Sequence, residues 1–160
     1  MGITTTVGIS DMAITKSKDD ILITYSLGSC LGLTVYDPEN NIGGLIHCLL
    51  PLAQTDQEKS KKNPMMFVET GVPILLQKII SLGAKKKNLV IKAAGCGKAL
   101  NSGEQFNIGQ RNFTVLRKIM WKNDILIKAK DVGGSKARTL TLNMQTGETF
   151  IKSGGDLYKI

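Results

Sequence analysis

Short runs of hydrophobic residues, bounded by glycine and polar residues, dominate the first third of the chain. The runs at 21–25, 31–36 and 44–50 have the length and the β-branched content of strands, and Pro51 ends the last of them. The other predicted strands are 3–10, 12–15, 89–94, 125–130, 136–143 and 148–152. A turn at 145–147 joins the final two strands into a hairpin. This pattern predicts a protein rich in β-structure.

A longer segment, 64–81, has the hydrophobic spacing of a helix. Asn63 before it is a favourable N-cap residue, and Pro64 suits the first helical position because no N–H partner is needed there. Gly71 and Pro73 inside the segment predict a break or a kink. We therefore expect a helix whose first turns are separate from the rest.

A second helix is predicted from Asn107, as its cap, to about Lys122, with an apolar face formed by Ile108, Val115, Ile119 and Met120. Strands that precede and separate two helices indicate an α+β fold. We expect a mixed β-sheet or sandwich flanked by two main helices, and not a doubly wound parallel sheet. With 160 residues, the chain is long enough for a single domain, residues 1–160, with one core.

A formal net charge of +8 raises the question of nucleic-acid binding. Lysines gather at 59–62 and 85–87, but aromatic residues make up only 5% of the chain and do not alternate with them. Platforms for stacking bases are therefore missing from the sequence, and we expect no nucleic-acid partner. A basic surface suits an acidic protein partner instead.

The chain shows neither a basic and apolar leader nor the roughly 18–20 consecutive apolar residues of a spanning helix. We expect a cytoplasmic protein without membrane insertion. Three cysteines, an odd number, fit a reducing compartment in which thiols stay free. The polar stretch 52–63 is interpreted either as a lid over a site or as a solvated connection.

The strongest chemical pattern combines Thr24, Cys30 and His47, which lie on or beside the three central predicted strands. His47 is the only histidine, and a nucleophilic cysteine needs a base to accept its proton. A third group must fix the tautomer and orientation of the imidazole. Thr24 can do this through its hydroxyl or through its backbone carbonyl. The alternative is that Cys30 is a small buried hydrophobic residue and His47 a satisfied core residue.

Gly28 and Ser29, directly before Cys30, are candidates for binding the substrate or an oxyanion. Gly28 allows a turn that other residues resist. Such a turn would expose the sulfur and leave nearby N–H groups free to stabilise a developing negative charge.

The remaining cysteines and two arginines have less specific interpretations. Cys48 is expected on the face of its strand opposite to His47, in the core, and Cys96 either has a structural role or lines a pocket. The cysteines lack the spacing of a metal site, so we predict no metal ligand. Arg111 and Arg138 either orient a substrate carboxamide or pair within the fold.

Motifs along nearly the whole chain resemble one family. TYSLGSCLGLTVYDP at 24–38 is followed by GGLIHCLLP at 43–51. Later motifs are FNIGQRN at 106–112, DVGGSKAR at 131–138 and NMQTGETFIK at 143–152. In this order they are similar to the chemoreceptor glutamine deamidases, the CheD family.

The resemblance implies a cysteine-hydrolase type of domain that acts as a protein-glutamine glutaminase. Such an enzyme converts glutamine side chains on the cytoplasmic helices of methyl-accepting chemotaxis receptors to glutamate and releases ammonia through a thioester. The resemblance assigns Cys30, His47 and Thr24 to catalysis and requires no cofactor. Two alternatives stay open: a binding partner of the chemotaxis phosphatase CheC, and a thiol hydrolase that acts on a receptor methyl ester.

The chain departs from the family pattern in two places. Many relatives carry a basic residue and a tyrosine where this chain has Met66 and Phe67, and a glycine pair where it has Gly95 and Cys96. Neither change touches the three presumed catalytic residues. We expect these differences to affect substrate preference and partner binding more than the reaction.

Overall fold

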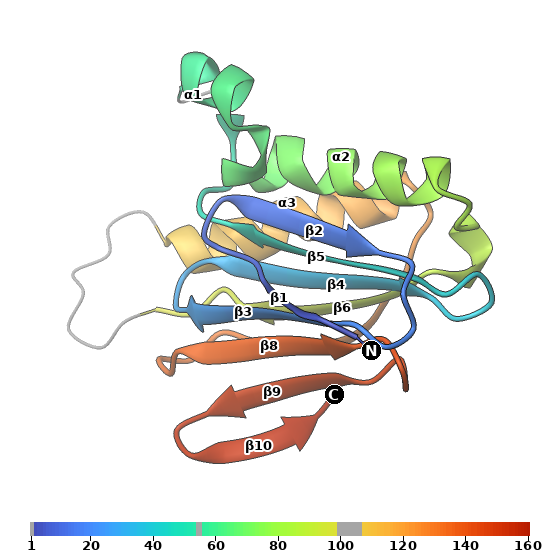
Figure 1. Ribbon diagram of the computed structural model, residues 1–160. Helices are drawn as coiled ribbons and strands as arrows, with labels where there is room; N and C mark the ends of the chain where they lie inside the picture. The colour runs from blue at the N-terminus through green and yellow to red at the C-terminus, as the bar shows by residue number, and fades with distance from the viewer. Residues whose placement is uncertain (1, 54–55, 99–106) are drawn as a thin grey trace.

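The protein is built of two five-stranded β-sheets and a layer of helices (Figure 1). The computed structural model describes residues 2–53, 56–98 and 107–160. Sheet A contains, in spatial order, β1 (Thr4–Thr6), β3 (Ile21–Leu27), β8 (Arg138–Asn143), β9 (Thr149–Ser153) and β10 (Asp156–Lys159). Sheet B contains, in spatial order, β2 (Asp11–Thr15), β5 (Ile42–Cys48), β4 (Leu31–Asp37), β6 (Val90–Gly95) and β7 (Ile127–Val132). Both sheets are mixed, because β1 runs parallel to β3 and β6 runs parallel to β7. The predicted α+β fold is confirmed.

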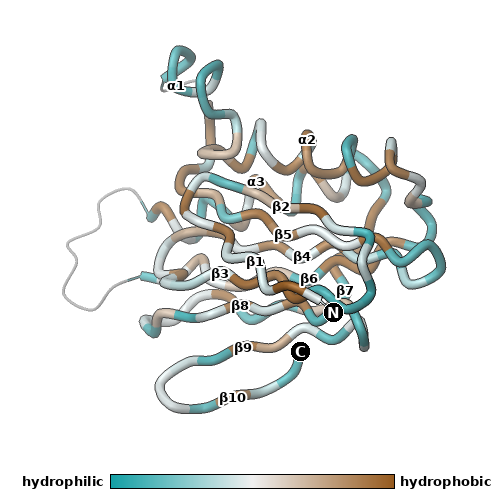
Figure 2. Tube along the Cα trace, in the orientation of Figure 1, coloured by the Kyte–Doolittle hydropathy of each residue, from teal (hydrophilic) through white to brown (hydrophobic). Residues whose placement is uncertain are grey.

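Sheet B is the middle layer of the protein. The helices α2 (Val68–Ser81) and α3 (Ile108–Lys122) cover one of its faces, and sheet A covers the other (Figure 1). Every residue of β5 is buried, including His47, and Figure 2 shows hydrophobic colour along only part of this strand. One apolar cluster lies between sheet B and the helices, and a second lies between the two sheets.

The predicted helix 64–81 is divided earlier than expected. Residues Pro64–Met66 form a short 3₁₀ helix, η2, and Phe67 then adopts an extended conformation with φ −113° and ψ 136°. The first turn is separate from the rest, as predicted, but helix α2 continues through Gly71 and Pro73, so a break at those residues was wrong. Pro73 costs one main-chain hydrogen bond, and the burial of apolar side chains against sheet B outweighs that loss.

The caps of the predicted helices differ in detail from those expected. Asn63 precedes Pro64, which is the first residue of η2 as predicted, but the Asn63 side chain makes no capping hydrogen bond. Asn107 precedes α3 in the left-handed conformation, with φ 46°, and its side chain makes no capping bond either. The helical positions are therefore held by packing more than by their caps.

Other differences lie in the strands and connections. The first predicted strand is shorter, Thr4–Thr6, and Ser10 turns the chain with a φ of 61°. The polar stretch after Leu52 contains a helix, α1 (Gln57–Lys62), which has no buried residue and projects beyond α2 in Figure 1. Strand β10 was not predicted, because all of its side chains are exposed and it has no apolar face. A short 3₁₀ helix, η3 (Lys86–Asn88), precedes β6.

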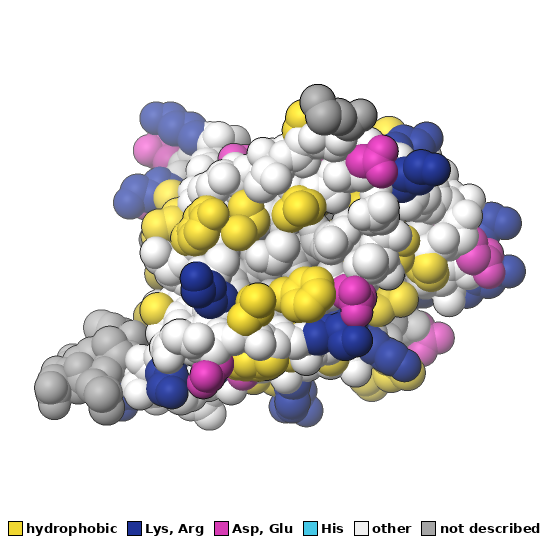
Figure 3. Space-filling view, turned by 60° about the horizontal axis from the view of Figure 1, so that its bottom comes forward, with side chains coloured by type: hydrophobic (Ala, Val, Ile, Leu, Met, Phe, Trp, Pro, Cys, Tyr) yellow, Lys and Arg dark blue, Asp and Glu magenta, His cyan; other side chains and the backbone are white. Residues whose placement is uncertain are grey.

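None of the helices that the structure describes covers the outer face of sheet A (Figure 1). Hydrophobic side chains gather on the surface that comes forward in Figure 3, between lysines and arginines. Tyr25 and Leu157, both on sheet A, are 51% and 68% exposed. Within the described ranges, no helix is long and apolar enough to cross a membrane.

Candidate active site

Thr24 and His47 meet between the two sheets. Thr24 lies on β3 of sheet A and His47 on β5 of sheet B, and both side chains are fully buried. The Thr24 hydroxyl donates a hydrogen bond to the carbonyl of Val7 at 2.7 Å, and its Oγ1 lies 2.7 Å from Nδ1 of His47. A hydroxyl has one hydrogen to donate, so Oγ1 must accept from Nδ1–H. The proton of the neutral imidazole is therefore on Nδ1, and the lone pair is on Nε2.

His47 lies opposite Gly32 in the β4–β5 pair. A Cβ at Gly32 would come within 2.6 Å of Leu27 Cδ1 and 2.9 Å of Leu140 Cδ2, so both leucine side chains would have to move to admit a larger residue. Nε2 of His47 is buried and has no hydrogen-bond partner among the residues described. Burial lowers the pKa of His47 to about 4, which keeps the imidazole neutral at physiological pH.

Cys30 ends the loop that leads into β4. It packs in the cluster between the two sheets, with Leu27 and Leu140, and its side chain is 6% exposed. It precedes Gly32 by two positions, and residues two apart share a face of a strand, so the thiol and the imidazole of His47 belong to the same face of sheet B. Burial raises the pKa of the Cys30 thiol, and its own backbone N–H partly offsets this effect.

In the unliganded protein at physiological pH, therefore, Cys30 is a protonated thiol and His47 is a neutral imidazole. No hydrogen bond joins Nε2 to a described residue, Cys30 included. Such a pair can still act as nucleophile and base, because hydrogen bonds in unliganded sites are often long and shorten when the substrate binds.

In the loop that ends at Cys30, the backbone carbonyl groups accept hydrogen bonds from other parts of the fold. The carbonyl of Gly28 accepts from Gly97 N–H at 2.8 Å, and that of Cys30 accepts from Cys96 N–H at 2.8 Å. The carbonyl of Ser29 accepts from Nδ2 of Asn112 at 2.9 Å. The N–H groups of Ser29 and Cys30 have no carbonyl partner in the described part of the chain. This arrangement suits the binding of an oxyanion.

Gly28 does not play the conformational part that we expected. Its φ lies outside the left-handed region, and the residue with positive φ in this bend is Ser26, at 61°. The N–H of Gly28 donates to the Ser26 carbonyl at 3.0 Å and is not available to a ligand. A Cβ at Gly28 would meet nothing within 4 Å, so the space beside this residue is open. Gly28 therefore leaves room for an approaching group, but its backbone does not adopt the left-handed conformation that favours glycine.

Helix α3 holds the loops of the site together. The fully buried Asn112 donates both to Ser29 O and, at 3.3 Å, to Leu49 O, just beyond the strand that carries His47. One turn earlier on α3, Gly109 packs so closely that a Cβ there would lie 2.2 Å from Gly97 O. Sequence reasoning missed this role. The available signal was a polar side chain, Asn112, one turn before Leu116 on the buried face of the helix.

The other predicted residues separate into structural and peripheral groups. Cys48 packs on the helix side of sheet B, as predicted, and burial strongly raises the pKa of its thiol. Cys96 is 5% exposed and has a φ of 53°. Arg138 is buried and pairs within the fold, because it donates to Gly133 O at 2.6 Å and to Asp131 at 3.4 Å. Arg111 lies on the surface of α3, in a groove.

Comparison with known proteins finds similar sequences along most of the chain. The sequence model described as CheD chemotactic sensory transduction matches residues 49–153. A protein of Syntrophus aciditrophicus named probable chemoreceptor glutamine deamidase CheD 1 is 44% identical over 149 residues, which cover 93% of each chain. Two proteins named probable chemoreceptor glutamine deamidase CheD, from Solibacter usitatus and Clostridium tetani, are 38% and 39% identical over 93% of this chain. The aligned regions cover 88% and 90% of those two proteins.

Proposed function

Because this chain belongs to the CheD family of chemoreceptor glutamine deamidases, we propose that Cys30, His47 and Thr24 hydrolyse the carboxamide of glutamine side chains on chemoreceptors. The observation that carries the proposal is the hydrogen bond between Thr24 Oγ1 and His47 Nδ1. It leaves the lone pair of Nε2 on the face that Cys30 shares. A base with one nitrogen fixed and the other free is the arrangement that a cysteine nucleophile requires.

In the first half of the reaction, Cys30 Sγ attacks the carboxamide carbon while His47 Nε2 takes the thiol proton. The carbonyl oxygen becomes an oxyanion, which the N–H groups of Ser29 and Cys30 are suited to bind. The tetrahedral intermediate then collapses as His47 returns the proton to the leaving nitrogen. Ammonia departs, and a thioester between Cys30 and the substrate remains.

In the second half, water attacks the thioester carbon and His47 accepts a proton from it. Collapse of this second intermediate breaks the C–S bond, and His47 returns the proton to the sulfur. The products are a glutamate side chain and the free thiol of Cys30. The low pKa of His47, about 4, keeps it unprotonated before each attack.

The test is mass spectrometry of a purified chemoreceptor cytoplasmic fragment after incubation with the protein. Each deamidated glutamine adds about one mass unit, because an acid replaces an amide. Cys30→Ala should abolish the gain. Cys48→Ala is the matched control, because Cys48 is also a buried free thiol but lies on the helix side of sheet B. A mass gain that persists in Cys30→Ala would overturn the assignment of the nucleophile.

The same experiment addresses the alternative roles. Release of methanol from a methylated fragment, without ammonia, would indicate a methyl esterase. No change with either protein would favour a binding role, with the chemotaxis phosphatase CheC as the partner to test by co-purification with Cys30→Ala. We also propose that the protein works in the cytoplasm, because its three free cysteines suit a reducing compartment.

A further inference from the structure

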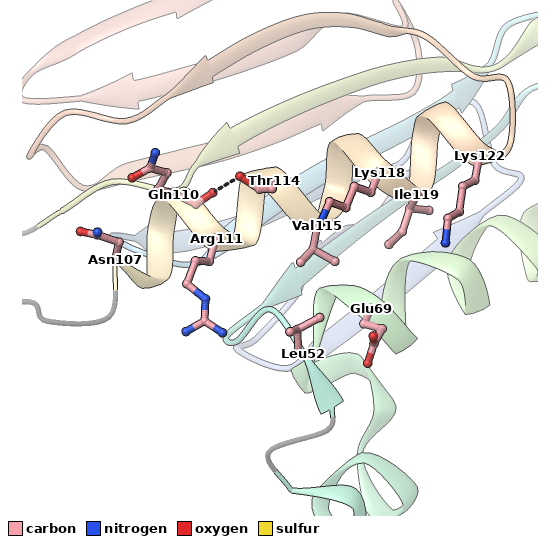
Figure 4. A pocket seen from close by; sticks show the side chains of 10 residues that line it. All are labelled: Leu52, Glu69, Asn107, Gln110, Arg111, Thr114, Val115, Lys118, Ile119 and Lys122. Carbon is pink, nitrogen blue, oxygen red and sulfur yellow. Dashed lines mark hydrogen bonds between the residues drawn. The ribbon is translucent and has the colours of Figure 1, made fainter.

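A groove with a volume of about 590 Å³ runs between α3 and the segment that joins β5 to α2 (Figure 4). Its lining includes three apolar side chains and three cations: Leu52, Val115 and Ile119, and Arg111, Lys118 and Lys122. In Figure 4 the Arg111 side chain reaches from α3 toward the segment that carries Leu52. The groove is separate from the buried position of His47 between the sheets.

Spacing along α3 places these residues in one stripe. Residues 111, 115, 118, 119 and 122 are separated by steps of three and four, so they share one face of the helix. The eleven steps along the helix from residue 111 to residue 122 span about 16 Å, which is about three turns of a second helix laid alongside. The stripe is long enough to contact a helical segment and not only a single side chain.

Among the described residues, the cations of this stripe have no acidic partner. Arg111, Lys118 and Lys122 form no salt bridge with any residue that the structure describes. Of the described residues that line the groove, Glu69 alone carries a carboxylate, which accepts a hydrogen bond from Ala53 N–H at 3.1 Å. An apolar floor with an unpaired positive rim favours a partner that is apolar on one side and acidic at its edges.

The groove begins beside the candidate active site. Arg111 is next to Asn112, whose side chain donates to Ser29 O and Leu49 O. A segment bound along the groove would therefore enter at the end of α3 that supports the loop of Cys30. Binding there would bring a neighbouring part of the same substrate to the thiol.

We propose that this groove binds an acidic amphipathic helix of the protein substrate, next to the glutamine that Cys30 attacks. The inference rests on the proposed function and adds the chemistry by which the substrate is chosen. Apolar side chains of the bound helix would contact Val115 and Ile119. Its carboxylates would pair with the cations of the stripe, which gives an affinity that falls as salt screens the charges.

The test compares two triple charge reversals of equal size. The groove variant is Arg111→Glu, Lys118→Glu and Lys122→Glu, and the control is Lys85→Glu, Lys86→Glu and Lys87→Glu, three exposed cations near η3. Both are made in the Cys30→Ala protein, and titration calorimetry measures their binding to a receptor cytoplasmic fragment. We expect the groove variant to bind at least about tenfold more weakly and the control to change by less than about threefold. Similar weakening in both, or none in either, would overturn the proposal.

Binding in the absence of turnover separates this proposal from the catalytic one. If the protein with its thiol releases no ammonia but the groove variant still loses affinity, only the reaction assignment fails. Glutamine replacements at the same three groove positions should weaken binding less than glutamate does, and they keep the test valid if the reversal disturbs folding. A double-stranded oligonucleotide serves as the competing ligand. If it binds as tightly as the receptor fragment and depends on the same cations, the groove is a general polyanion site and the proposal is wrong.

Discussion

Thr24 and His47 are hydrogen-bonded across the interface of two different sheets, at 2.7 Å between Oγ1 and Nδ1. The orientation of the proposed base therefore depends on how sheet A packs on sheet B. The hydroxyl of Thr24 also donates to Val7 O, beyond the end of β1. In this structure it is the hydroxyl that contacts the imidazole, which favours one of the two possibilities that the sequence left open.

Replacing Thr24 separates the role of its hydroxyl from that of its shape. Thr24→Val is nearly isosteric but removes the acceptor for Nδ1–H, so the imidazole loses its fixed tautomer. We expect kcat/KM for the receptor fragment to fall about 100-fold or more. Thr24→Ser keeps the hydroxyl and should stay within about tenfold of the parent. Equal activity of the Val and Ser variants would show that the hydroxyl is not required.

The burial of His47 predicts a dependence of stability on pH. Its pKa is about 4 in the folded protein and 6.5 in the reference state, so the unfolded chain binds more protons between these values. The free energy of unfolding should therefore fall as pH drops from 6.5 toward 4, by about 3 kcal/mol for this group. Denaturant titrations of the parent and of His47→Gln at several pH values measure this contribution. If the free energy of unfolding changed with pH by the same amount in both proteins, His47 would make no such contribution.

The same pKa sets the acid limit of the reaction. As the proposed base, His47 can accept a proton only when it is neutral, and its pKa of about 4 keeps it neutral down to about pH 4 in the free protein. We expect kcat/KM to remain high through pH 6 and to decline near the folded pKa, within the range where the protein stays folded. Initial rates of ammonia release across this range provide the measurement. A decline centred near 6.5 would indicate an imidazole exposed to solvent.

Asn112 is expected to matter for catalysis through position alone. Asn112→Ala removes the hydrogen bonds to Ser29 O and Leu49 O and should cost about 1–3 kcal/mol of stability. It should lower kcat by at least about tenfold, with a smaller change in KM, because the Cys30 loop loses its anchor. Asn123→Ala is the control, since Asn123 also bonds a backbone carbonyl, that of Ile119, at the other end of α3. If kcat fell equally in both variants, Asn112 would stabilise the fold in general and would not specifically position the Cys30 loop.

Alanine substitutions at two glycines near the site, Gly32 and Gly28, should affect stability differently. Gly32→Ala places a methyl group within 2.6 Å of Leu27 between the sheets, and overpacking of this kind costs about 1–3 kcal/mol. Gly28→Ala meets open space, so its melting temperature should stay close to that of the parent. If the open side of Gly28 receives the substrate, KM rises in that variant while stability does not change. Thermal melts and steady-state kinetics of the two variants provide the comparison.

The local pattern was enough to predict the central strands, the two main helices and the contact between Thr24 and His47, while the catalytic role of Cys30 stays a prediction. Each of these depends on residues close in sequence or on a chemical requirement that few residues in the chain can meet. The support from Gly109 and Asn112 could not be predicted from the pattern, because it arises from contacts with residues at positions 29, 49 and 97. The conformation expected of Gly28 was wrong because Ser26 takes the left-handed position of that bend.

The adjacency of His47 and Cys48 has a consequence for folding fidelity. Neighbouring residues on a strand face opposite sides, so His47 lies between the sheets and Cys48 lies beneath the helices. A slip of β5 by one position against β4 would exchange their places and send the imidazole into the helical layer. The molecule would keep its secondary structure but lose the proposed base, so we expect a misregistered population to be inactive yet look native by circular dichroism.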